Sequence, residues 1–306
     1  MPVAADARCD TMCGMRGERT AIVGCALLIA ANALAAPRPI RLLAQRTSAS
    51  DLEVGGELAG VPRGETRYVT HQALLALPQV SFTVKGDSNF TGPTPIKGVL
   101  LEELARDLGA APAADLVVAI CDDKYRANYP RDYLEAHHPV LVLEVNGKPP
   151  SGWPKDSGGH GFDMGPYMIS HEEFAPAFKI LSHTDEAQIP WGVVRLEFRN
   201  EKTVFGAIAP RGTQANDPYV QAGYKIAEQN CFRCHNMGDE GGQKSGIGWP
   251  LIAAVADTSR EFFAAYVRDP KAKSPTAQMP GSPQYDDETL QALGDYFRTF
   301  YGGVQP

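Results

Sequence analysis

Residues 231–235 read CFRCH, and this short segment constrains the chain more than any other. The spacing C-x-x-C-H is the attachment site of a c-type haem. Two thiols three positions apart, those of Cys231 and Cys234, can both reach the vinyl-derived carbons along one edge of a porphyrin. The imidazole of His235 then falls under the iron as an axial ligand. The motif therefore predicts one covalently bound haem c, with His235 on the iron.

A C-x-x-C pair has two other common uses, as a redox dithiol and as half of a zinc site. A zinc site needs a second pair of ligands nearby, and no cysteine follows Cys234. A thioredoxin-like pair is expected beside a βαβ pattern, and none surrounds this segment. Haem attachment is therefore the interpretation that fits the surroundings of the motif.

The amino-terminal residues 1–36 have the pattern of an export signal. Arg16 and Arg19 precede an uncharged run, residues 21–36, which contains the sequence Ala-Leu-Ala near its end, as a signal peptidase accepts. The run is shorter than the ~20 apolar residues of a usual membrane span. We therefore expect a periplasmic protein, with membrane attachment only through a signal segment that stays uncleaved.

The export signal changes how the six cysteines are interpreted. Three of them fall within the expected signal, where lipoprotein processing at Cys25 is a minor alternative because the apolar run continues past it. The mature part keeps Cys121 and the two motif cysteines, Cys231 and Cys234. Three cysteines, two of them in one motif, do not indicate a disulfide framework.

Signals for helices surround the motif. Asp217 is followed by proline, a capping residue and then a first-turn residue, and an apolar face runs through 219–230. Thr258 begins a capping box that opens a second helix. Acidic residues at 286–288 favour the start of a last helix, whose apolar stripe ends at Phe300.

Residues 215–303 resemble a class I cytochrome c, with a helix before C-x-x-C-H and a carboxy-terminal helix that crosses it. The resemblance implies that the carbonyl of Pro250 orients His235. It also implies that Met279, in the sequence QMPG, is the second axial ligand of the haem iron. A thioether raises the reduction potential relative to bis-histidine ligation, which suits an electron acceptor. Met237 is a rival ligand, but it lies only two residues past His235.

The preceding region has a different style, with short apolar strands and few helices, and predicts an α+β domain. One amphipathic helix is expected over 98–108. The expected strands are 116–120, 140–145, 193–198 and a partner strand over 203–208.

This region resembles the molybdopterin-binding domain of the sulfite oxidase type. The matching stretches are 96–104, 119–125, 143–149 and 165–169. Active members of that family bind molybdenum through a cysteine upstream of the Gly-Val-Leu segment, and residues 80–97 contain no cysteine. Cys121 is out of register with that position. We therefore expect a degenerate, cofactor-free docking domain without molybdopterin.

Six of the seven histidines lie outside the haem region, and an added metal site is conceivable from His160, Asp163 and His171. Their spacing fits no fixed coordination motif. Scattered histidines are usually surface or hydrogen-bonded residues, so we do not expect a metal there.

The predicted fold class is thus a two-domain chain: a degenerate α+β domain of the sulfite oxidase-like fold, followed by an all-α class I cytochrome c domain. The expected divisions are a signal peptide at 1–36, a flexible segment at 37–60, the α+β domain at 61–210 and the cytochrome domain at 211–306.

The predicted function is electron transport between a periplasmic redox protein or dehydrogenase and a downstream cytochrome or terminal oxidase. We assign no catalytic residue. A formal net charge of −7 argues against nucleic acid as a partner, because phosphate binding needs clustered Lys and Arg. One alternative is a haem-containing molybdenum enzyme of the sulfite dehydrogenase type. Another is a non-catalytic subunit of a larger complex.

Overall fold

The computed structural model describes residues 40–155, 161–172 and 188–301. The expected signal peptide, 1–36, lies outside the described residues. Residues 38–306 group into one compact unit. The strands of its first part are β1 (Leu52–Gly56), β2 (Thr66–Val69), β3 (Val80–Val84), β4 (Thr94–Leu100), β5 (Leu116–Cys121), β6 (Arg126–Pro130), β7 (Val140–Val145), β8 (Tyr167–Ser170) and β9 (Trp191–Arg199). Its helical segments are α1 (His71–Leu75), α2 (Leu101–Asp107), α3 (Arg131–His137) and η1 (Pro150–Gly152).

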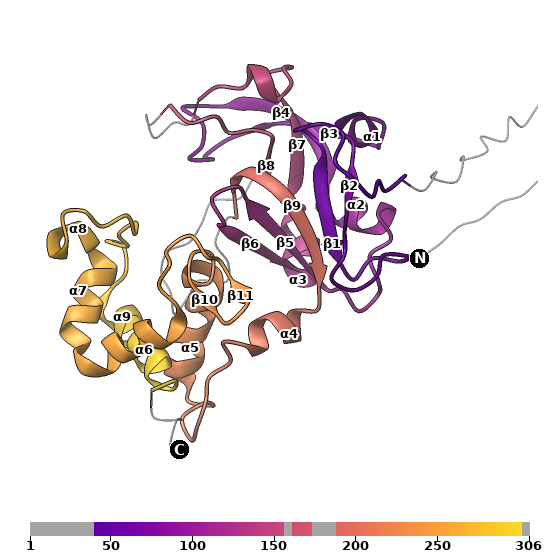
Figure 1. Cartoon of the computed structure of the whole chain (residues 1–306). Helices are drawn as coiled ribbons and strands as arrows, with labels where there is room; N and C mark the ends of the chain where they lie inside the picture. Colours follow the sequence, from indigo (N-terminus) through magenta and orange to yellow (C-terminus); the bar gives the residue numbers. More distant parts are fainter. Residues whose placement is uncertain (1–39, 156–160, 173–187, 302–306) are drawn as a thin grey trace, which may run out of the picture. The chain divides into compact units, whose positions relative to one another are not determined.

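The described strands of this part form one sheet, in which β9 is the branch point (Figure 1). The order β2-β1-β9-β8-β7-β4-β3 follows one path, and β5 pairs with β9 and β6 away from it. Among the strands of the described residues, only β1 and β9 pair in parallel. β1 lies within 37–60, the segment that the sequence predicts to be flexible. Leu52 and Val54 on this strand are fully buried. Alternate residues of a strand point to one face, and both side chains lie on the face that packs in the core.

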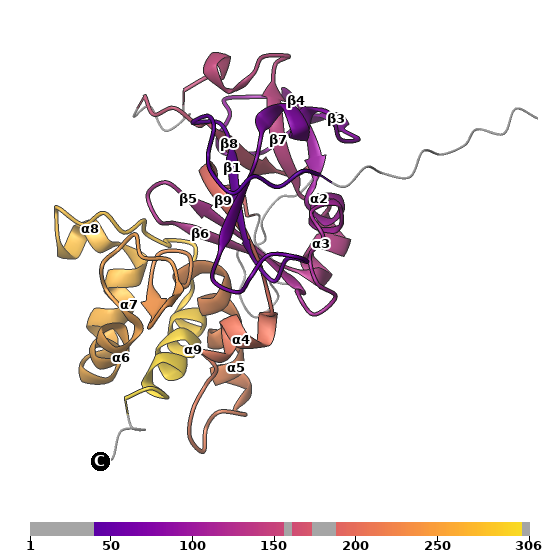
Figure 2. The same ribbon diagram turned by 45° about the vertical axis from the view of Figure 1, so that its right-hand side comes forward.

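The second part is mostly helical. Its elements are α4 (Glu201–Gly206), α5 (Pro218–Ile226), η3 (Ala227–Cys231), β10 (Asn236–Met237), β11 (Glu240–Gly241), α6 (Trp249–Thr258), α7 (Arg260–Arg268), α8 (Pro270–Lys273) and α9 (Asp287–Arg298). Helices α5 and α9 pack against each other, and α6 and α7 lie beside α9 (Figure 2). At the α5–α9 crossing, a Cβ on Gly223 would lie 2.1 Å from the carbonyl oxygen of Ala292. Only glycine allows the two helices to approach this closely.

Strand β5 belongs to two hydrophobic cores at once. Val117 and Ala119 pack in the core between the sheet and its helices. Leu116 and Val118, at the alternate positions, pack in the core that contains the carboxy-terminal helices. The strand is buried on both faces for this reason, as its continuous apolar sequence indicates. The carboxy-terminal helices are therefore built onto a strand of the sheet.

The predicted fold class, two domains with the second all-α, is therefore wrong. Residues 38–306 form one compact unit of mixed α/β structure. The helical part shares a core with β5, and it contains a small hairpin in which β10 pairs with β11. The physical reason is that the outer face of β5 is apolar and has to be covered.

Individual elements agree with expectation more closely. The strands predicted over 116–120, 140–145 and 193–198 are confirmed as β5, β7 and β9, and the last helix is confirmed as α9. The expected strand over 203–208 is wrong, because α4 occupies this segment. The side chain of Asn200 accepts a hydrogen bond from the amide of Thr203 and caps the helix. None of the helices in the described part of the chain has the length and apolar character of a membrane span.

Candidate haem-attachment site

The segment before the motif is a capped helix, as the sequence predicts. The carboxylate of Asp217 accepts hydrogen bonds from the first amides of α5, 2.8 Å from the nitrogen of Tyr219. The helix then widens into the π-helical turn η3, which ends at Cys231. The motif thus begins at the end of a helix that α9 holds in place.

Residues 231–235 fold into a tight turn. The carbonyl oxygen of Cys231 accepts hydrogen bonds from the amides of Cys234 and His235, at 3.2 and 3.0 Å. Phe232 is fully buried and packs edge-on against Trp249, with 5.4 Å between ring centroids. This buried ring anchors the turn, while Cys231, Cys234 and His235 remain half-buried. Both cysteines are present as thiols.

The imidazole of His235 is held through one nitrogen. Its Nδ1 lies 2.8 Å from the carbonyl oxygen of Ile247 and 2.8 Å from Oγ of Ser245. A carbonyl can only accept, so Nδ1 carries the proton and Nε2 carries the lone pair. Burial lowers the pKa of His235, although the hydrogen bond to Ile247 partly offsets this. The ring is therefore neutral near pH 7, as a metal ligand has to be.

Pro250, for which the resemblance implies the orienting carbonyl, lies in the first turn of α6. The carbonyl that contacts His235 belongs to Ile247, three residues earlier. Ser245 is a second partner that the sequence analysis did not identify. The sequence shows only a glycine-rich loop here, and no residue pattern reveals which of its carbonyls turns toward the histidine.

Two methionines lie at the edge of the neighbouring core. Met237 and Met279 are both half-buried and pack against the same cluster of apolar side chains. Ile247 and Leu251 are large apolar residues that stay 44% and 55% exposed. Of these two residues, Ile247 contacts the motif through its carbonyl oxygen, so its exposed side chain is apolar surface that a flat apolar ring could cover.

These residues fit a covalently bound haem. Such a group needs two thiols at the motif spacing, a neutral imidazole with one nitrogen held, and a thioether, and the described residues include each of these. Among residues 40–155, 161–172 and 188–301, no cluster of three or more His, Cys, Asp or Glu side chains is arranged to hold a metal ion. A porphyrin supplies four ligands itself, so a haem iron needs no such cluster.

The turn between β5 and β6 and Arg126, the first residue of β6, lie against the motif. The amide of Arg126 donates to the carbonyl oxygen of Arg233, at 2.9 Å. Glu240, on β11, forms ion pairs with Arg126 and Arg199 of the sheet. Burial raises the pKa of Tyr125 in this turn to about 12, and the nearby Arg233 partly offsets this effect. The motif is therefore braced by the sheet as well as by the helices.

The second candidate site, that of His160, Asp163 and His171, is not assembled in the described residues. His160 lies outside them. Asp163 pairs with Lys155. His171 is buried, with Nε2 at 3.0 Å from the hydroxyl of Tyr133. Each described member of the set thus has another partner.

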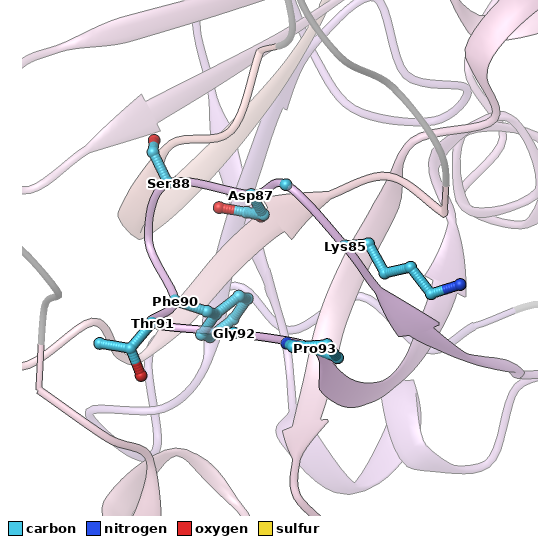
Figure 3. A pocket seen from close by; sticks show the side chains of 8 residues that line it. Lys85, Asp87, Ser88, Phe90, Thr91, Gly92 and Pro93 are labelled. Atoms are coloured by element: carbon cyan, nitrogen blue, oxygen red, sulfur yellow. The ribbon is translucent and has the colours of Figure 1, made fainter.

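The segment without the molybdenum-binding cysteine contains a shallow pocket of about 350 Å³, in the loop between β3 and β4 (Figure 3). Asp87 is its half-buried acid, and its Oδ2 accepts a hydrogen bond from Oγ of Ser170 at 2.6 Å. Burial raises the pKa of Asp87. Lys85 also lines the pocket but extends away from Asp87. The pocket therefore presents no thiolate and no pair of charged groups facing each other.

Comparisons with known proteins place few constraints on this chain. No family model matches the sequence. No curated protein matches it either. Among solved structures, the chain is similar to the crystal structure of the sulfane dehydrogenase SoxCD from Paracoccus pantotrophus, with 14% identity and a TM-score of 0.33. That match covers 56% of this chain and 45% of the SoxCD chain, so it spans less than half of the latter's length. A likeness at this level supports no argument about function.

Proposed function

We propose that this chain is an exported, monohaem c-type cytochrome that carries electrons between a dehydrogenase and a downstream acceptor. The observation that carries the proposal is the arrangement of Cys231, Cys234 and His235 in one tight turn. In that turn Nδ1 of His235 is hydrogen-bonded, while Nε2 has no hydrogen bond from the described residues.

Each residue has a separate role in this proposal. Bound haem supplies a one-electron couple between ferrous and ferric iron. Cys231 and Cys234 would hold the group covalently, and His235 would bind its iron through Nε2. The hydrogen bond that Nδ1 donates to Ile247 fixes the orientation of the ring and increases its basicity. Met279 would supply a soft thioether to the iron, with Met237 as the rival.

The sheet acts, in the same proposal, as a cofactor-free surface for docking a partner. Residues 80–97 provide no cysteine for molybdenum, and Cys121 is buried on β5. Burial raises the pKa of Cys121, with Asp123 and Asp122 adding to the effect. A protonated, buried thiol is a poor metal ligand. The partners on this proposal are a periplasmic dehydrogenase and a downstream cytochrome or oxidase.

Mass spectrometry tests the attachment after expression in a host that matures c-type cytochromes. The wild-type chain should carry the mass of one haem, and the variant Cys231→Ala with Cys234→Ala should carry none. The matched control is Cys121→Ser, which should keep the haem because Cys121 lies outside the motif. Absence of covalent haem from the wild-type chain would overturn the proposal.

Absorption spectroscopy tests the second ligand. The oxidised protein should show a weak sulfur-to-iron charge-transfer band, and Met279→Leu should remove it. Met237→Leu is the matched control, because Met237 packs against the same core. Loss of the band in the Met237 variant alone would transfer the ligand role to that residue. Reduction of the haem by sulfite in the isolated protein would instead favour the enzymatic alternative.

A further inference from the structure

The turn between β5 and β6, residues 122–125, has a fixed shape. Lys124 has a positive φ of 70°, and its amide donates to the carbonyl oxygen of Cys121 at 3.0 Å. Oδ1 of Asp123 accepts from the amide of Tyr125 at 2.9 Å. These two hydrogen bonds close the turn on itself. It therefore offers a defined set of groups to whatever lies against it.

What lies against this turn is the loop 242–247. The carbonyl oxygen of Lys124 accepts a hydrogen bond from the amide of Gln243, at 3.1 Å. Asp123 forms an ion pair with Lys244. The ammonium of Lys244 also lies 5.7 Å from the centre of the Tyr125 ring. Backbone, charge and ring contacts thus join the turn to two consecutive residues of the loop.

The same loop holds the proximal histidine. The amide of Ser245 donates to the carbonyl oxygen of Cys234 at 3.1 Å, so the loop follows the motif closely. Oγ of Ser245 and the carbonyl oxygen of Ile247 are the two groups on Nδ1 of His235. Lys244, which the turn fixes, is the residue immediately before Ser245. A continuous series of contacts therefore runs from the sheet to the histidine.

We propose that the β5–β6 turn is a positioning element for His235, which acts through the loop 242–247 and thereby sets the reduction potential of the haem iron. This inference rests on the proposed function. A well-aligned hydrogen bond from Nδ1 makes the imidazole a stronger electron donor. A stronger donor favours ferric iron and lowers the potential, so loosening the loop should raise the potential.

The ion pair between Asp123 and Lys244 separates this effect from a simple effect of charge. Removing a negative charge near the iron, as in Asp123→Asn, should raise the potential on either account. Removing a positive charge, as in Lys244→Met, should lower the potential if charge alone acts. If positioning dominates, Lys244→Met should raise the potential as well. The double variant should then shift it no further than either single variant.

The pair is partly exposed, with side chains 41% and 50% accessible, so both variants should fold. Lys97 and Glu144 form a comparable pair between β4 and β7, with 3.4 Å between Nζ and Oε1. Lys97→Met and Glu144→Gln are therefore matched controls, for which we expect no shift. Solvent exchange of the Nδ1 proton of His235, followed by nuclear magnetic resonance, should be faster in the Asp123 and Lys244 variants only.

Redox titration of the haem-loaded proteins measures the reduction potential of each variant and so tests the positioning role. Increases in both single variants, without additivity in the double variant, support the positioning role. Opposite shifts in the two variants, or no shift in either, overturn it. Absence of covalent haem from the wild-type chain overturns the proposed function and this inference with it. A loaded protein whose potential does not respond overturns this inference alone.

Discussion

The sheet and the helical part each hold a buried or half-buried histidine with a lowered pKa, and the two differ in what occupies Nε2. Beside the sheet, the amide of Gln188 donates to the hydroxyl of Tyr133, and that hydroxyl is hydrogen-bonded to Nε2 of His171. In the helical part, Nδ1 of His235 is hydrogen-bonded to Ser245 and Ile247 of the loop 242–247. Nε2 of His235 has no hydrogen bond from the described residues. A buried imidazole with Nε2 occupied stabilises the fold, whereas one with Nε2 available can serve as a ligand.

The largest test of this comparison replaces each histidine by glutamine. His235→Gln should abolish the native haem spectrum of the loaded protein, and added imidazole should restore part of it, because only the iron ligand is lost. His171→Gln should keep the spectrum but lower the free energy of unfolding by about 1–3 kcal/mol, since a buried hydrogen bond is lost. Absorption spectra and denaturant titrations measure the two effects. Identical behaviour of the two variants would break the comparison.

The next test asks whether the two parts unfold together. A Cβ at Gly98 would lie 2.1 Å from the carbonyl oxygen of Leu141 in the sheet, as one at Gly223 would from that of Ala292. Alanine at either position should lower the free energy of unfolding by about 3 kcal/mol. Because β5 belongs to both cores, circular dichroism and haem absorbance should report one shared transition in both variants.

Gly206→Ala is the control for these two variants, because nothing lies within 4 Å of the Cβ that it would add. It should leave the transition nearly unchanged. Separate transitions in the two core variants, one for each part, would show that the parts fold independently.

Acid should weaken the sheet through His171. Burial lowers the pKa of His171 from 6.5 to about 3, and the neighbouring His137 adds to the shift. Between these values the unfolded chain binds a proton that the folded chain does not, so stability falls as pH decreases. From pH 6 to 4.5 the wild-type chain should lose about 2 kcal/mol relative to His171→Gln. Denaturant titrations of both proteins at each pH measure this difference, and parallel curves would contradict it.

The smallest effect is expected at Asp163. Its side chain is 84% exposed and pairs with Lys155, which is also largely exposed. Asp163→Asn should change the free energy of unfolding by no more than about 0.5 kcal/mol. A chelator should not alter the melting temperature of either protein. A larger loss, sensitive to chelator, would revive a metal role for this residue.

Much of the local structure could be predicted from the sequence. The mostly apolar segment 140–145 is β7, and Asp217 caps α5. The helical structure of 203–208 could not be predicted from composition, because Val204 and Phe205 favour a strand when considered alone. The side chain of Asn200 caps the segment and stabilises a helix. The side chains of Val204 and Phe205 are buried on the face of that helix that points to the core. Local capping outweighed the intrinsic preference of the apolar residues.

Part of the candidate site could likewise be predicted from the sequence, and part could not. Cys231, Cys234 and His235 are predicted from spacing alone, because the proposed chemistry depends on adjacent positions in one turn. The partners of Nδ1 do not, since Ile247 contributes a backbone carbonyl and every residue has one. The predicted fold class is wrong for a related reason. The apolar run of β5 indicates burial on both faces, but it does not say which part of the chain covers the second face.

The shared strand limits how this chain can be divided or recombined. A chain cut at residue 210 would divide the core that Leu116 and Val118 share with the carboxy-terminal helices. Val220 and Phe232, which belong to the same core, would remain on the other side of the cut. The carboxy-terminal segment is therefore not a transferable cassette, and moving it into another protein would require a substitute for that apolar strand.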